Sequence, residues 1–193
     1  MDKLVVIACS TGGPKALQRI IPSLPENLEC PILIVQHMPV GFTKSLANRL
    51  NDISAIKVVE AEEGMEVEKG TVYLAKGGFQ MRVKRKPGRQ HYISLSEEPA
   101  KNGLRPCADV LLESLIQTDF KSIVCTILTG MGDDGLAGIT KLRMKKQLYI
   151  VTQDKETSTV YGMPKAIVLA GYSDEEVPLQ KVTEVIIKNL EVH

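Results

Sequence analysis

The chain has 193 residues, 44% of them hydrophobic, which is enough to bury one substantial core and favours a single domain over residues 1–193. Its 24 basic and 23 acidic residues nearly cancel and it has no tryptophan, so nucleic acid is not an expected partner. It has neither a signal-like segment nor an apolar run near 18 residues, so we expect a cytoplasmic protein that is not inserted in a membrane.

The first predicted unit is a buried strand over residues 4–8, a tight turn, and a helix that opens at Pro14. Ser10 lies at the tip of the turn, with small residues two positions away on each side, Ala8 and Gly12. A sharp strand-to-helix turn needs small neighbours and exposes the central hydroxyl above the carboxyl end of the strand. Ser10 is therefore a candidate nucleophile.

The same turn is also compatible with phosphate binding, because a glycine-rich turn before a helix presents backbone N–H groups to an anion. Two absences weigh against a nucleotide site. Neither G-x-G-x-x-G nor G-x-x-x-x-G-K-[ST] is present, and the next strand ends in a histidine where a ribose-binding fold would have an acidic residue.

A second strand over residues 31–35 ends at Gln36 and His37, and a helix follows around residues 42–50. This β-α-β-α rhythm predicts an α/β fold: a doubly wound, mostly parallel sheet with helices on both faces. Short β-rich runs at residues 58–59, 71–75, 80–83 and 92–95, separated by glycine turns, predict an attached antiparallel hairpin subregion.

After Pro106 the sequence again predicts alternating helices and strands. We expect a helix over residues 110–116 and a buried strand over residues 123–128 that runs into a glycine-rich turn containing Asp133 and Asp134. A helix at 136–144, a strand at 148–152, a helix at 164–169 and an amphipathic helix at 179–190 complete the chain.

Three predicted strands thus end in Ser10, in His37 and in the Asp133-Asp134 pair. The carboxyl ends of parallel strands share one edge of a sheet, where ligands bind. A hydroxyl nucleophile needs a base, and an imidazole base needs a carboxylate to orient it, so this set predicts a Ser-His-Asp triad. Each residue alone could be a cap or turn former, and the Asp pair could form a metal loop. No further carboxylates follow at a metal-loop spacing, so no metal is expected.

Three motifs carry a resemblance to a known family: Ala8–Gly13, Gln36–Thr43 and Leu128–Gly135. Through them the chain, from about residue 4 to about residue 187, resembles the catalytic domain of the CheB family of bacterial chemotaxis methylesterases. Arg105-Pro106 and Gly162-Met163-Pro164 add weaker support.

The resemblance implies a role for each matching residue. Ser10 would be the nucleophile, His37 the base and then the acid, and Asp134, the aspartate directly before the glycine, the orienting carboxylate. Backbone N–H groups near Thr11 and Met131 would receive the oxyanion. Arg105 would contact the substrate.

The implied reaction is hydrolysis of glutamate γ-methyl esters on the cytoplasmic domains of chemoreceptors, with release of methanol and without a cofactor. Glutamine deamidation at the same site would be a second reaction. Family members usually carry a receiver domain, so this chain is expected to be either an excised catalytic domain or a stand-alone member. A phosphate- or nucleotide-binding module and a catalytically idle receptor-docking domain remain as alternatives.

Overall fold

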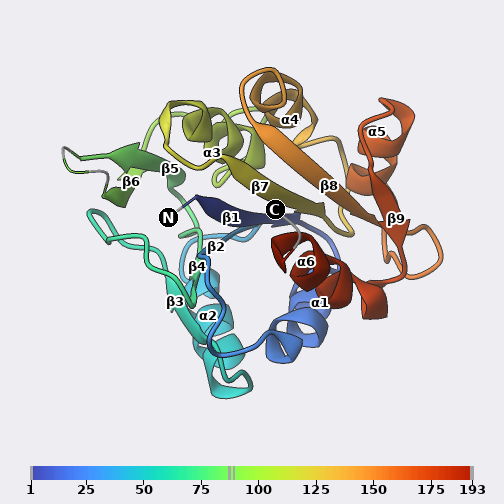
Figure 1. Cartoon of the computed structure of the whole chain (residues 1–193), viewed down its shortest axis with the longest axis horizontal. Helices are drawn as coiled ribbons and strands as arrows, with labels where there is room; N and C mark the ends of the chain where they lie inside the picture. Colours follow the sequence, from blue (N-terminus) through green and yellow to red (C-terminus); the bar gives the residue numbers. More distant parts are fainter. Residues whose placement is uncertain (1, 87, 89, 192–193) are drawn as a thin grey trace.

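A computed structural model of the chain describes residues 2–86, 88 and 90–191 and contains a seven-stranded sheet with helices on both faces (Figure 1). The strand order is β3-β4-β2-β1-β7-β8-β9, and neighbouring strands run parallel. The predicted doubly wound α/β fold is confirmed. The strands are β1 (Lys3–Cys9), β2 (Ile32–Gln36), β3 (Lys57–Glu60), β4 (Thr71–Leu74), β7 (Ser122–Ile127), β8 (Gln147–Gln153) and β9 (Glu175–Val177).

The central strand β1 is buried on both faces, which explains its continuous apolar sequence. Val5, Ile7 and Cys9 belong to one hydrophobic core. Alternate residues of the same strand, among them Leu4 and Val6, belong to a second core on the opposite face. One sheet therefore separates two cores.

Helices cover both faces of the sheet, as Figure 1 shows. On one face lie α1 (Gly13–Ile20), α2 (Phe42–Asp52) and α6 (Val182–Glu191), and on the other α3 (Ala108–Ser114), α4 (Leu136–Leu142) and α5 (Met163–Leu169). Short 3₁₀ turns lie at η1 (Ile21–Ser23), η2 (Leu115–Gln117) and η3 (Leu179–Lys181). Among the residues that the structure describes, none of these helices is long and apolar enough to span a bilayer.

The antiparallel subregion is smaller than predicted. It consists of β5 (Gln80–Arg85) and β6 (His91–Ser96), whose apolar side chains pack into the second core. Residues 57–60 and 71–74 instead join the main sheet as parallel strands, since β4 is buried throughout and pairs with both β2 and β3. The edge strand β9 was not expected, because two of its three residues are glutamates and leave no apolar pattern.

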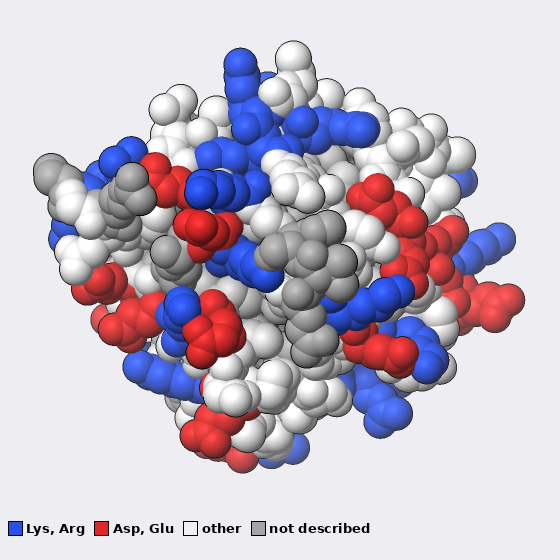
Figure 2. Space-filling model, in the orientation of Figure 1, with Lys and Arg blue, Asp and Glu red and all other residues white. Residues whose placement is uncertain are grey.

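The strand order reverses between β1 and β7, since β2 lies on one side of β1 and β7 on the other. Ligands of open α/β sheets bind beyond the carboxyl ends of the strands at such a point. Basic and acidic side chains both occur over the face of the molecule drawn in Figure 2, as the near-zero net charge implies.

Candidate active site

The loops that follow β1, β2 and β7 are joined by main-chain hydrogen bonds at the carboxyl edge of the sheet. The N–H of Ser10 donates to the carbonyl oxygen of Thr129 at 3.0 Å, and the N–H of His37 donates to that of Cys9 at 3.1 Å. A Cβ atom on Gly130 would lie 2.9 Å from Cβ of Ser10, so only glycine permits this approach of the β7 loop. The three sequence-predicted strand ends therefore meet.

Gln36, the last residue of β2, connects the loop after β1 with the loop after β2 through hydrogen bonds. Its Nε2 donates to the carbonyl oxygens of Ser10 and His37, at 3.0 and 3.1 Å. Its Oε1 accepts the thiol hydrogen of Cys9 at 3.1 Å, and the residue is buried. This role of Gln36 was not expected from the sequence, although a polar residue that ends an apolar strand is a signal for one.

His37 and Asp134 form a close pair, with His37 Nε2 2.7 Å from Asp134 Oδ2. The Asp134 carboxylate also accepts the N–H groups of Ala108 and Asp109, at 2.7 and 3.0 Å, and the Cys107 thiol at 3.1 Å. Burial alone would raise the pKa of Asp134, but these hydrogen bonds, that of His37 foremost, lower it below its usual value. Asp134 is therefore held as a carboxylate.

The two adjacent aspartates differ sharply in environment. Asp134 is 5% exposed, whereas the side chain of Asp133 is on the surface. Gly135 follows at a φ of 103°, a conformation that favours glycine, and α4 begins at the next residue. The chain thus turns directly after Asp134 and leaves its carboxylate inside.

Ser10 is partly buried, and its carbonyl oxygen accepts the same Gln36 amide as that of His37. Within the described part of the chain its hydroxyl has no hydrogen-bond partner, and the same holds for the N–H groups of Thr11 and Met131. Met131 is 74% exposed and Thr11 is also on the surface, so a carbonyl group can reach both loops. Contacts between a nucleophile and its base are often loose before substrate binds.

Arg105 lies near His37 but is already engaged. Its Nη1 donates to the carbonyl oxygens of Glu97 and Glu98, at 2.8 and 2.9 Å. It lines a cavity of about 260 Å³ together with His37 and Met38. Arg105 therefore forms a fixed wall of this cavity, with only part of its guanidinium left for a ligand.

The buried side chains of Cys107, Asp109 and Asp134 have ligand-type atoms within 4.8 Å of one another. Hydrogen bonds account for this arrangement. Oxygens of both carboxylates accept backbone N–H groups, and burial together with the charge of Asp134 raises the pKa of the Cys107 thiol to about 12. A protonated thiol that donates a hydrogen bond is a poor metal ligand, so these residues fit a hydrogen-bonded cluster.

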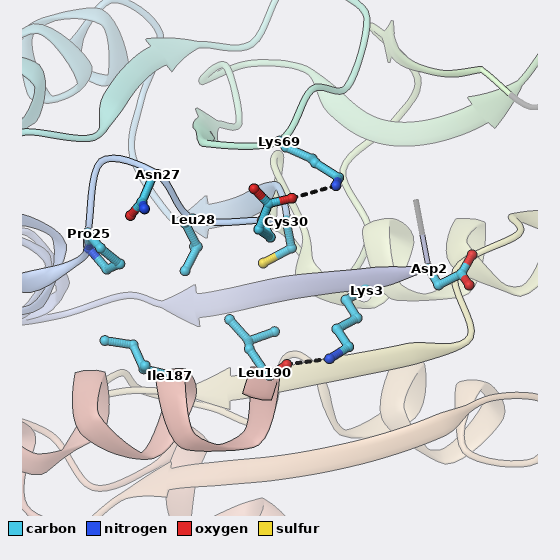
Figure 3. A pocket seen from close by; sticks show the side chains of 10 residues that line it. Asp2, Lys3, Pro25, Asn27, Leu28, Cys30, Lys69, Ile187 and Leu190 are labelled. Carbon is cyan, nitrogen blue, oxygen red and sulfur yellow. Dashed lines mark hydrogen bonds and ion pairs between the residues drawn. The ribbon is translucent and has the colours of Figure 1, made fainter. Parts of the chain in front are cut away.

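A cavity of about 650 Å³ lies at the other end of the sheet, beside Lys3, where β1 begins (Figure 3). The ion pair between Lys69 and Glu29, at 2.6 Å, lies at its rim, and the Lys3 ammonium donates to the carbonyl oxygen of Leu190. Ser10 follows the opposite end of β1, so this cavity is separate from the candidate active site.

A doubly wound α/β domain with a serine and a His-Asp pair at one edge of its sheet carries the residue types that serine hydrolases of several unrelated folds use. Comparison with known proteins narrows this class. The chain belongs to the CheB methylesterase family, whose model matches residues 5–186.

Solved and curated relatives agree with this assignment. The crystal structure of the Thermotoga maritima CheB methylesterase catalytic domain superposes with a TM-score of 0.92 at 43% identity, over 100% of both chains. The protein-glutamate methylesterase/protein-glutamine glutaminase 1 of Syntrophomonas wolfei is 46% identical over 98% of this chain and 54% of its own length. A Pyrococcus horikoshii relative named protein-glutamate methylesterase/protein-glutamine glutaminase is 44% identical over 97% of this chain and 50% of its own. The chain thus spans about half the length of these curated relatives.

Proposed function

We propose that this chain, as a single catalytic domain over residues 1–193, is a protein-glutamate methylesterase that hydrolyses glutamate γ-methyl esters on chemoreceptors and releases methanol. The observation that carries the proposal is the bond between His37 and Asp134 at the sheet edge where Ser10 also lies. Membership of the CheB methylesterase family supplies the substrate class.

In this mechanism the Ser10 hydroxyl oxygen attacks the ester carbonyl carbon while His37 takes the hydroxyl proton. The N–H groups of Thr11 and Met131 stabilise the oxyanion of the tetrahedral intermediate. The intermediate collapses as the C–O bond to the methoxy group breaks, and His37 protonates the departing oxygen to give methanol. Asp134 holds the imidazole in the required tautomer and stabilises its charged form.

The acyl-enzyme is then hydrolysed by the reverse use of the same groups. His37 takes a proton from a water molecule, whose oxygen attacks the acyl carbon. Ser10 leaves with that proton, and the product is a free glutamate side chain. These steps require no cofactor.

Glutamine deamidation follows the same path, with ammonia in place of methanol as the leaving group. It is supported by the names of the relatives, which include protein-glutamine glutaminase. Both substrates present a carbonyl at the end of the same two-carbon side chain, so one site serves both reactions.

The proposed substrates are the cytoplasmic domains of methyl-accepting chemoreceptors, which places the reaction in the cytoplasm. A receiver domain, whether supplied by a longer chain or by a separate protein, is the proposed regulatory partner. Arg105 is proposed as a substrate contact, supported by its place in the wall of the cavity beside His37.

The test is methanol release from methylated receptor signalling domains by the wild type, by Ser10→Ala and by Ser23→Ala. We expect Ser10→Ala to lower turnover by about 10⁶-fold. Ser23, an exposed residue at the end of the turn η1, is the control and should behave as the wild type. Folded wild-type protein that releases no methanol from a receptor known to be methylated would contradict the proposal and favour a phosphate- or nucleotide-binding module.

A further inference from the structure

Asp109 is a buried carboxylate that the proposed mechanism leaves unused. It lies in the first turn of α3, is 3% exposed, and its side chain is turned toward the start of α4. Oδ1 of Asp109 accepts the N–H groups of Gly135 and Gly138, at 3.0 and 2.7 Å. Asp109 therefore satisfies two backbone donors of the turn that directly follows Asp134.

Asp134 makes the matching contacts in the opposite direction. Its carboxylate accepts the N–H groups of Ala108 and Asp109, where α3 begins. Asp109 thus caps the start of α4, which follows Asp134, and Asp134 caps the start of α3, which contains Asp109. The four hydrogen bonds hold the two helix starts together. A shift of Asp109 away from α4 would release the turn that holds the Asp134 carboxylate against His37.

We propose that Asp109 is a positioning residue that fixes the Asp134 carboxylate at His37. This inference rests on the proposed function, in which Asp134 orients His37. A misplacement of about 1 Å in a catalytic group costs about 10²-fold in rate, so a second residue that fixes its position contributes to turnover without touching substrate.

The contribution of Asp109 is its acceptor geometry and not its charge. Burial raises the pKa of Asp109. The hydrogen bond from the Gly138 N–H lowers this pKa, and the neighbouring negative charge of Asp134 raises it further. An ionised Asp109 would repel the negative charge of the Asp134 carboxylate. An asparagine would keep an oxygen acceptor for Gly135 and Gly138 and remove the repulsion.

The experiment therefore compares Asp109→Asn, which keeps the acceptor, with Asp109→Leu, which has a similar volume and no acceptor. We expect Asp109→Asn to retain kcat within about threefold and Asp109→Leu to lose about 10²-fold in kcat with KM nearly unchanged. Asp174→Leu is the control at an exposed position, because Asp174 also accepts a backbone N–H, that of Ile150, but precedes the edge strand β9. It should lose stability and keep kcat.

A second measurement does not depend on activity: the ¹H NMR resonance of the His37 Nε2 proton bonded to Asp134. It should persist in Asp109→Asn and shift or disappear in Asp109→Leu. One possible result is that the wild type shows this resonance, that Asp109→Leu lacks it, and that the wild type releases no methanol. In that case the proposed function fails and the positioning role stands. A folded Asp109→Leu variant with wild-type kcat and resonance would overturn the inference. If Asp109→Leu does not fold, a 10²-fold loss of kcat in folded Asp109→Asn would overturn it as well.

Discussion

His37 presents Nε2 to Asp134 at 2.7 Å, so Nδ1 is the ring nitrogen that would face the Ser10 hydroxyl in the proposed mechanism. A carboxylate only accepts hydrogen bonds, which places the proton of the neutral ring on Nε2 and leaves Nδ1 free to act as a base. The pair therefore fixes the tautomer as well as the orientation of the imidazole.

Replacing Asp134 by asparagine should lower kcat by about 10⁴-fold. The amide of Asn can donate to Nε2, which moves the ring proton to Nδ1 and blocks it as a base. The measurement is methanol release from methylated receptor domains. Asp133→Asn is the matched control, because the Asp133 side chain is exposed. A larger loss in Asp133→Asn than in Asp134→Asn would reverse the assignment of the two aspartates.

Gln36→Met should lower both kcat and stability. The methionine has a similar shape but cannot donate to the carbonyl oxygens of Ser10 and His37, and losing a buried hydrogen-bond partner costs about 1–3 kcal/mol. Gln80→Met is the control: Gln80 is equally buried, but its amide donates to Leu104. Thermal unfolding and turnover should both be measured. A comparable loss of stability in the two variants with a loss of kcat only in Gln36→Met is the expected result.

Gly130→Ala should displace Ser10. The new Cβ would lie 2.9 Å from Ser10 Cβ and 3.1 Å from Ser10 N, closer than packed atoms allow. The nearest atom, the Met163 sulfur, can move aside, but the serine backbone is bonded to Thr129 and has less freedom. We expect the rate of labelling by a serine-directed phosphonate to fall at least about tenfold, in line with a displaced catalytic group. Labelling at the wild-type rate would show that the loop absorbs the methyl group elsewhere.

Much of this arrangement could be predicted from the sequence, because strand ends are visible in it. Residues that directly follow apolar strands of a parallel sheet share one edge, so Ser10, His37 and the aspartate pair were expected together before any distance was known. Choosing Asp134 over Asp133 required the family resemblance, since both follow β7 and only the direction of the turn at Gly135 separates them.

The supporting contacts could not be predicted in the same way. Asp109 and Asp134 are 25 residues apart in the chain, and their mutual capping depends on how α3 packs against α4. The parallel pairing of β3 was also missed, because its short apolar run at Val58-Val59 is compatible with either strand direction. Local pattern sets the type of an element, whereas its neighbours depend on the packing of the whole sheet.

The stability of the protein should fall as the pH is lowered through the range in which His91 titrates. His91 is buried, stacks on Phe120 with ring centroids 4.4 Å apart, and its Nε2 accepts the Asp119 N–H. Burial lowers the pKa of His91; the charge of Asp119 opposes this, while Arg85 and Lys146 add to the lowering. The unfolded chain therefore binds the His91 proton at a higher pH, near 6.5, than the folded protein does. The contribution of His91 to the free energy of unfolding is complete above about pH 6.5. It is lost as the pH falls toward the lower pKa that His91 has in the folded protein.

Thermal unfolding of the wild type and of His91→Gln at pH 7.5 and at pH 5.0 measures this contribution. Glutamine can still accept the Asp119 N–H but does not titrate, so the variant should be less stable than the wild type at pH 7.5, where the ring stacking is lost. The difference in stability between the two proteins should be smaller at pH 5.0, because only the wild type must then exclude a proton from a buried ring. Carboxylates that titrate as the pH falls are common to both proteins and cancel in the difference. An equal gap at the two pH values would mean that His91 has the same pKa in the folded and unfolded chain.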